Sequence, residues 1–68
     1  MESKHMRIRR NWLMGFCSIA VVNAVLYDPM TDAQKFKILE RAKQIAKAEG
    51  RYRVYVEDWQ QALDEMNK

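Results

Sequence analysis

The sequence predicts an all-α fold, a small three-helix domain with a short extended connector before its last helix. Three observations indicate this fold. The segment Thr31–Gly50 carries the start signal, the apolar face and the stop signal of one helix. The segment Glu57–Met66 repeats apolar residues at helical spacing. Only two glycines and one proline occur, which leaves few residues for the tight turns of a β-sheet.

Length and composition restrict the chain to one small domain. It has 68 residues, of which 49% are hydrophobic and 31% charged, and this balance is typical of a globular chain rather than a disordered one. The formal net charge is +3 and the sequence pI is about 9.2. Such a charge mildly favours nucleic acid, anionic lipid or an acidic protein as partner, and is equally typical of an ordinary solvated surface.

The N-terminal residues 1–6 carry no hydrophobic pattern and are expected to be a tag or a disordered N-terminus. His5-Met6 is a common cloning junction. The single helical domain is therefore expected over residues 7–68. It opens with a basic cluster of Arg7, Arg9 and Arg10.

The first helix is expected from about Arg10 to Tyr27. Its segment Trp12–Tyr27 is uncharged and is interrupted only by Ser18 and Asn23. Such a helix is apolar nearly all round, more than a monomer of this size can bury, which favours a helix shared with a second copy. Two alternatives stay open. The segment is short for a membrane span, which needs about 20 apolar residues, and its β-branched residues also suit a strand.

The second helix is expected over Thr31–Glu49, after a break at Pro29, which cannot continue a helix. Thr31 and Gln34 have the spacing of a capping box. Gly50 stands where a left-handed cap ends a helix.

The connector is expected over residues 51–56, where Tyr52, Val54 and Val56 alternate with Arg51, Arg53 and Tyr55. Alternation indicates an extended segment, with two or three residues paired in a dimer. The third helix is expected over Glu57–Met66. The second and third helices would form a pair around a core of Phe36, Leu39, Ile45, Val54, Trp59 and Leu63.

The residue types do not suggest an enzyme. His5 is the one histidine, so no zinc ligand set is expected. Cys17 is the one cysteine; it excludes an internal disulfide, and a thiol inside an apolar segment is usually inert. Asp28 and Asp32 bracket Pro29, where turn and helix N-terminal roles are expected. We therefore predict no catalytic residues, cofactor, metal or small-molecule substrate.

Two sets of residues are predicted to contact partners. The hydrophobic interface set shares large apolar side chains: Trp12, Phe16, Ile19, Val22, Leu26, Trp59 and Met66. The nucleic-acid set shares positive charge: Arg7, Arg9, Arg10, Lys37, Arg41, Lys47, Arg51 and Arg53, with Lys43 at the edge of the helix face and Tyr55 as a stacking ring.

The segment AKQIAKAEGRYRVYVEDWQQAL resembles the C-terminal part of an archaeal-type histone fold. The shared features are alanines on the helix, Gly50-Arg51 at the turn, a valine-bearing connector, and Glu57-Asp58 opening the next helix. The resemblance implies that Arg51 and Arg53 meet DNA phosphates. Upstream the chain departs from a histone, whose central helix is longer and continuous where Pro29 stands here.

Residues 12–63 also resemble the small helical domain of light-independent protochlorophyllide reductase. Trp12, Pro29, Gly50 and Ala62 follow the order of that domain: an aromatic-led helix, a proline, a basic helix ending in glycine, and a final helix. The family's proline-aromatic-Val-Arg signature is replaced here by Pro29-Met30-Thr31-Asp32.

Together these observations predict a small non-enzymatic helical module that binds a protein partner or a second copy of itself, in the cytoplasm. One alternative is a basic, histone-like nucleic-acid-binding protein. The other is a membrane-associated, single-pass anchored subunit of a larger complex, with residues 12–27 in lipid.

Overall fold

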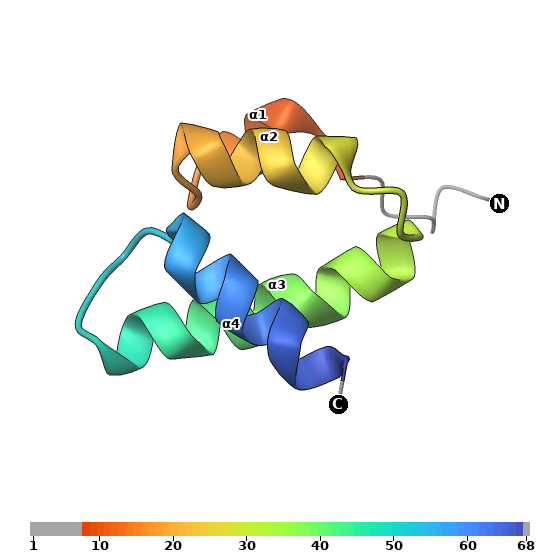
Figure 1. Ribbon diagram of the computed structural model, residues 1–68. Coiled ribbons are helices and arrows are strands. Elements are labelled where there is room, and N and C mark those ends of the chain that lie inside the picture. Colours follow the sequence, from red (N-terminus) through yellow and green to blue (C-terminus); the bar gives the residue numbers. More distant parts are fainter. Residues whose placement is uncertain (1–7, 68) are drawn as a thin grey trace, which may run out of the picture.

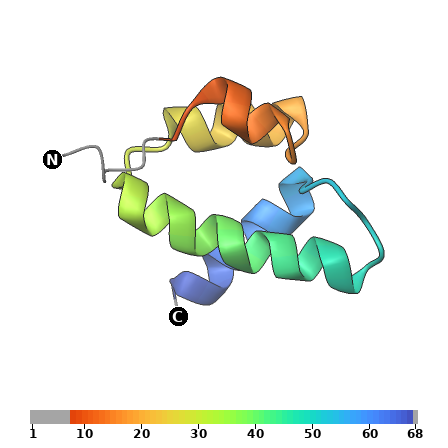
Figure 2. The same cartoon turned by 180° about the vertical axis from the view of Figure 1, so that it is seen from behind.

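The computed structural model describes residues 8–67 and confirms the all-α fold. The helices are α1 (Arg10–Met14), α2 (Ile19–Tyr27), α3 (Asp32–Ala48) and α4 (Val56–Met66). The short helices α1 and α2 form one layer, and α4 crosses α3 in the other, as both views show (Figure 1, Figure 2).

The predicted single helix over Arg10–Tyr27 is wrong, because the segment divides into α1 and α2. Gly15 ends α1, and Ser18 caps α2 by accepting a hydrogen bond from the Val21 amide at 3.4 Å. The break lets each short helix turn its own apolar side inward, so that Leu13 on α1 and Val21 on α2 are both fully buried. One monomer thus buries much of the segment that seemed too apolar for it.

A parallel bridge between Cys17 and Val54 holds this break in place. The Val54 amide donates to the Phe16 carbonyl oxygen at 2.8 Å, and the Ser18 amide donates to the Val54 carbonyl oxygen at 2.9 Å. Val54 of the connector therefore pairs within its own chain, and pairing of the connector in a dimer stays a prediction. The strand alternative for residues 12–27 is also wrong, because residues 8–67 contain this isolated bridge and no strand.

The predicted alternation of the connector is wrong as well. Val54 is buried, but Tyr52 is fully exposed and Val56 is 44% exposed. The reason is that Val56 already begins α4, so its side chain follows the helical period and not the extended one.

Both predicted ends of the central helix are confirmed. The Thr31 hydroxyl accepts from the Gln34 amide at 3.2 Å, and the Gln34 side chain accepts from the Thr31 amide at 3.4 Å. At the other end Gly50 has φ 77°, and the Arg51 amide donates to the Ala46 carbonyl oxygen at 2.9 Å. These contacts form a Schellman motif, which satisfies carbonyl groups that a helix end leaves free.

The core lies between the two layers and draws on all four helices. Of the predicted core residues, Leu39, Ile45, Val54 and Trp59 are buried, and Leu63 is partly buried against them. Phe36 is outside this cluster and packs on Trp12 instead. Within residues 8–67, no helix combines the length and the apolar character that crossing a membrane requires.

Candidate functional site

Two surfaces of this fold have the character of binding sites. The first is the outer side of α2, which we call the α2 face. Ile19 is 67% exposed and Tyr27 is 82% exposed. Ile19, Asn23 and Tyr27 follow one another at intervals of four residues, so they lie on one side of the helix. The face consists of Met14, Ile19, Ala20, Asn23 and Tyr27.

No residue from Asn11 to Tyr27 is charged, so the α2 face carries no charge of its own. At one end Met14 and Ile19 line a shallow hollow of about 300 Å³ together with Arg53. The nearest charged contact to the centre of the face is the Arg10 guanidinium, which donates to the Asn23 side-chain oxygen at 3.5 Å. The α2 face therefore combines exposed apolar side chains with one partly buried amide at its middle.

The second surface lies where α1 meets α3, and we call it the basic groove. Its floor is a cluster of three rings: Trp12 lies 4.9 Å from Phe16 and 5.2 Å from Phe36, in both cases edge to face. Two hollows adjoin this cluster. One of about 330 Å³ is lined by Trp12, Phe36, Lys37, Leu39, Glu40 and Lys43.

The other hollow is larger, about 500 Å³, and lies at the C-terminal end of α3. Its lining residues are Phe16, Lys43, Lys47, Gly50, Arg51 and Tyr52. The Lys43 ammonium sits 4.9 Å from the centre of the Phe16 ring, a cation–π contact that holds this charge over an aromatic face. The hollow therefore joins apolar rings to fixed positive charge.

The structure does not gather the predicted hydrophobic interface residues on one surface. Val22 and Trp59 lie in the core, so neither is available to a partner in this conformation. Leu26 is partly buried against the core. Met66 is exposed, but it ends α4. Trp12 and Phe16 belong to the basic groove, which leaves Ile19 as the predicted residue on the α2 face.

The predicted nucleic-acid set is divided in a similar way. Arg7 lies outside the described residues. Arg9 and Arg10 are exposed near the start of α1, whereas Lys37 and Lys47 line the hollows of the basic groove. The remaining members, Arg41, Arg51 and Arg53, hydrogen bond within the chain.

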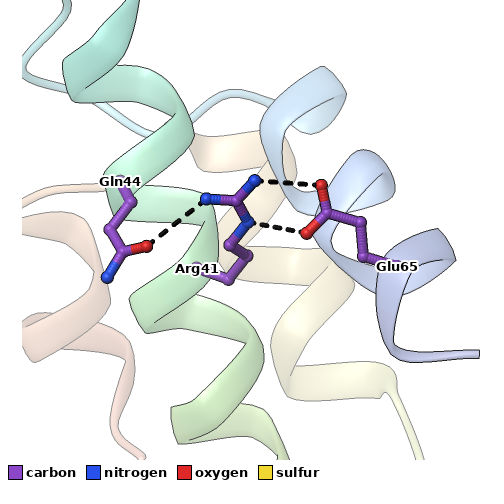
Figure 3. A network of polar contacts seen from close by, with 3 residues as sticks. All are labelled: Arg41, Gln44 and Glu65. Carbon is purple, nitrogen blue, oxygen red and sulfur yellow. Dashed lines mark hydrogen bonds and ion pairs between the residues drawn. The ribbon is translucent and has the colours of Figure 1, made fainter.

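Arg41 links α3 to α4 (Figure 3). Its Nε and Nη2 atoms donate to the two carboxylate oxygens of Glu65 at 2.6 and 3.1 Å, and its Nη1 donates to Gln44 at 3.4 Å. The hydrogen bonds to Glu65 raise the pKa of Arg41. This guanidinium is therefore already paired with a carboxylate.

Arg51 and Arg53 hold the connector. Arg51 Nη2 donates to Asp58 Oδ1 at 2.8 Å, and Asp58 Oδ2 accepts from the Tyr55 amide at the start of α4. Arg53 Nη1 donates to the carbonyl oxygens of Met14 and Cys17 at 3.2 and 2.8 Å. The histone resemblance assigned both arginines to DNA phosphates, and here both are bound to groups of their own chain.

Cys17 lies beneath this turn and is 1% exposed. Burial raises the pKa of its thiol to about 11, although the positive charges of Lys43 and Arg53 act to lower it. The thiol is therefore protonated at neutral pH, and a protonated thiol is a poor nucleophile. Within residues 8–67 no three His, Cys, Asp or Glu side chains come together as a metal site would require.

Several members of both surfaces were missed by reasoning from the sequence. Ala20 and Tyr27 are exposed and Asn23 is partly exposed, which was not expected of a helix that was predicted to be apolar nearly all round and shared with a second copy. Ser18 is a good helix N-cap three residues after Gly15, and these two residues together signal the break that exposes them. Tyr52 was assigned to the same side of an extended connector as Val54, and no local signal contradicts that assignment.

Comparison with protein-family models, with curated proteins and with solved structures finds no match to this chain. Both family resemblances therefore stay predictions.

Proposed function

We propose that this chain is a small non-enzymatic interaction module that associates with a second copy of itself through the α2 face. One observation carries the proposal: α2 buries one side completely and leaves the other side apolar and uncovered. Val21, Val22 and Val25 are 0% exposed, while Ile19 and Tyr27 on the opposite side are 67% and 82% exposed. Exposed apolar side chains gathered on one side of a helix are typical of interaction sites.

A second copy of the chain suits this face because of the distribution of charge. The chain carries a net charge of +3, which gives a mild overall repulsion between two copies. The residues of the α2 face are themselves uncharged, so two-fold packing would bring the apolar side chains of Ile19 and Tyr27 together. The Arg10 guanidinium, which donates to Asn23, is the positive charge that this packing has to accommodate at the middle of the face. Asn23 at its middle has both donors and an acceptor, and can hydrogen bond to its equivalent in the second copy.

The chemistry of the described residues supports a non-enzymatic role. The Cys17 thiol is buried and protonated at neutral pH, and Asp58 is bound to Arg51. A cytoplasmic location, expected from the sequence, belongs to the same proposal.

The variant Ile19→Glu tests the proposal in sedimentation experiments over a concentration series. Ile19 is the first residue of α2, where the helix dipole favours an acid, so folding should be retained. We expect the wild-type chain to form dimers and Ile19→Glu to be monomeric, because dimerisation would bury two unpaired carboxylates.

Met66→Glu is the matched control, since Met66 is exposed, apolar and outside the α2 face. It should dimerise like the wild-type chain. Equal association of the Ile19→Glu variant and the wild-type chain would overturn the assignment of this face.

A further inference from the structure

We propose that the hollow at the C-terminal end of α3 binds single-stranded nucleic acid, with a base against its aromatic rings and phosphates on Lys43 and Lys47. This activity is separate from the α2 face. The hollow is lined by Phe16, Lys43, Lys47, Gly50, Arg51 and Tyr52 and has a volume of about 500 Å³. That volume is within the range of small-ligand sites, about 300–1,000 Å³.

The aromatic rings supply the first half of the recognition. Tyr52 is 100% exposed, so its ring has no packing role within the described chain and is free to stack on a base. Phe16 is partly buried and fixed edge to face against Trp12, which makes it a rigid wall of the hollow. Base–aromatic stacking contributes about 1–3 kcal/mol per base in proteins that bind single strands.

The lysines supply the second half. Lys43 and Lys47 stand one helical turn apart on α3, and both line this hollow. The Lys43 ammonium lies 4.9 Å from the centre of the Phe16 ring and covers one face of it, so Tyr52 supplies the open stacking surface. Arg51 adds little net charge, because its guanidinium is paired with Asp58 at 2.8 Å and lies near Glu57 at 3.9 Å. The attraction for phosphate therefore comes from the two lysines.

The combination favours a single strand over other anionic partners. An acidic peptide would pair with the lysines through its carboxylates, but it offers a ring only where an aromatic residue occurs and not in every unit. A duplex keeps its bases paired and stacked inside, so the exposed Tyr52 ring has no free base face to stack on. A single strand offers a base and a phosphate in every unit, which matches rings and lysines lining one hollow.

Fluorescence anisotropy with a labelled oligothymidylate of roughly a dozen nucleotides tests this proposal. We expect binding by the wild-type chain that weakens with salt, with a slope of log K against log salt of about −1.4 for two phosphate contacts. The double variant Lys43→Gln/Lys47→Gln should lose most of that slope. Tyr52→Ala should weaken binding about tenfold through lost stacking.

Matched controls separate the hollow from general attraction. Arg9→Gln/Arg10→Gln removes the same charge outside the hollow, and Tyr27→Ala removes an exposed ring on the α2 face. Both should bind like the wild-type chain. Circular dichroism of each variant checks that the helices are retained.

Three results would overturn the proposal. The arginine pair could weaken binding as much as the lysine pair. An unlabelled duplex or a polyglutamate peptide could displace the labelled oligothymidylate as well as an unlabelled single strand does. The wild-type chain could also fail to bind the oligothymidylate at low salt.

Discussion

The Val54 amide donates to the Phe16 carbonyl oxygen at 2.8 Å, joining two loops 38 positions apart in the sequence. The same bridge continues through the Ser18 amide, which donates to the Val54 carbonyl oxygen. It fixes the turn between α1 and α2, and so determines both the exposure of the α2 face and the position of Phe16 in the basic groove. Four predictions test the contacts around this bridge and at the ends of the helices.

Arg53→Ala should lower the free energy of unfolding by about 1–2 kcal/mol, because hydrogen bonds from a charged group to two carbonyl oxygens are lost. Urea denaturation followed by circular dichroism measures the change. Arg9→Ala is the control, since Arg9 is exposed and its side chain caps no helix. A stability of Arg53→Ala equal to that of the control would show that Arg53 does not hold the turn.

Asp58→Ala should lower the free energy of unfolding by about 2–3 kcal/mol. The change removes the acceptor for the Tyr55 amide and leaves the Arg51 guanidinium without its closest carboxylate. Glu57→Ala changes the neighbouring acid, whose side chain is 86% exposed, and should change stability very little. Thermal unfolding of both variants side by side measures the difference, and similar losses for the two would contradict this role of Asp58.

Gly50→Ala should destabilise the chain by about 1–2 kcal/mol, because a residue with a Cβ atom is strained in the left-handed region. Nothing lies within 4 Å of a Cβ atom placed at Gly50, so the cost comes from the backbone and not from a clash. Glu49→Ala, at an adjacent exposed position with negative φ, is the control for denaturation. An unchanged midpoint for Gly50→Ala would be inconsistent with the φ of 77°.

The Cys17 thiol should resist alkylation at pH 8 in the folded chain and react readily in denaturant. With a pKa of about 11, only about one thiol in a thousand is ionised at that pH. The folded chain holds this proton more tightly than the unfolded one, whose thiol has the ordinary value of 9.0. The resulting stabilisation is complete below pH 9 and is lost as the pH rises toward 11.

Mass spectrometry after timed exposure to iodoacetamide measures this protection. Rapid labelling of the folded chain at pH 8 would mean that Cys17 is accessible and that the turn above it opens easily.

Local signals predicted α3 well. Thr31, Gln34 and Gly50 act within one helical turn of themselves, so the sequence around them suffices to place both ends of the helix. The break in the first predicted helix depends instead on Val54, which is distant in sequence and pairs only in the folded chain. The apolar segment favoured one continuous helix, and this signal outweighed the weaker signals of a break at Gly15 and Ser18.

The candidate surfaces were predicted less well, for the same reason. Positive charge indicated Lys37 and Lys47 as nucleic-acid-binding residues, which stays a prediction, and both line hollows of the basic groove. Charge alone could not show that Arg41, Arg51 and Arg53 bind groups within the chain. Hydrophobicity predicted Ile19 and Val22 equally as interface residues. Only the rotation of α2 against the core determines that Val22 is buried and Ile19 exposed.

The mass of the wild-type chain in solution, measured by light scattering at low and at high salt, tests the central claim most directly. One chain has a mass of 8.1 kDa. We predict twice that mass at tens to hundreds of micromolar, maintained or strengthened at high salt, because the α2 face is uncharged and its burial is hydrophobic. A single-chain mass throughout this range, or a dimer that dissociates as salt is added, would contradict the account.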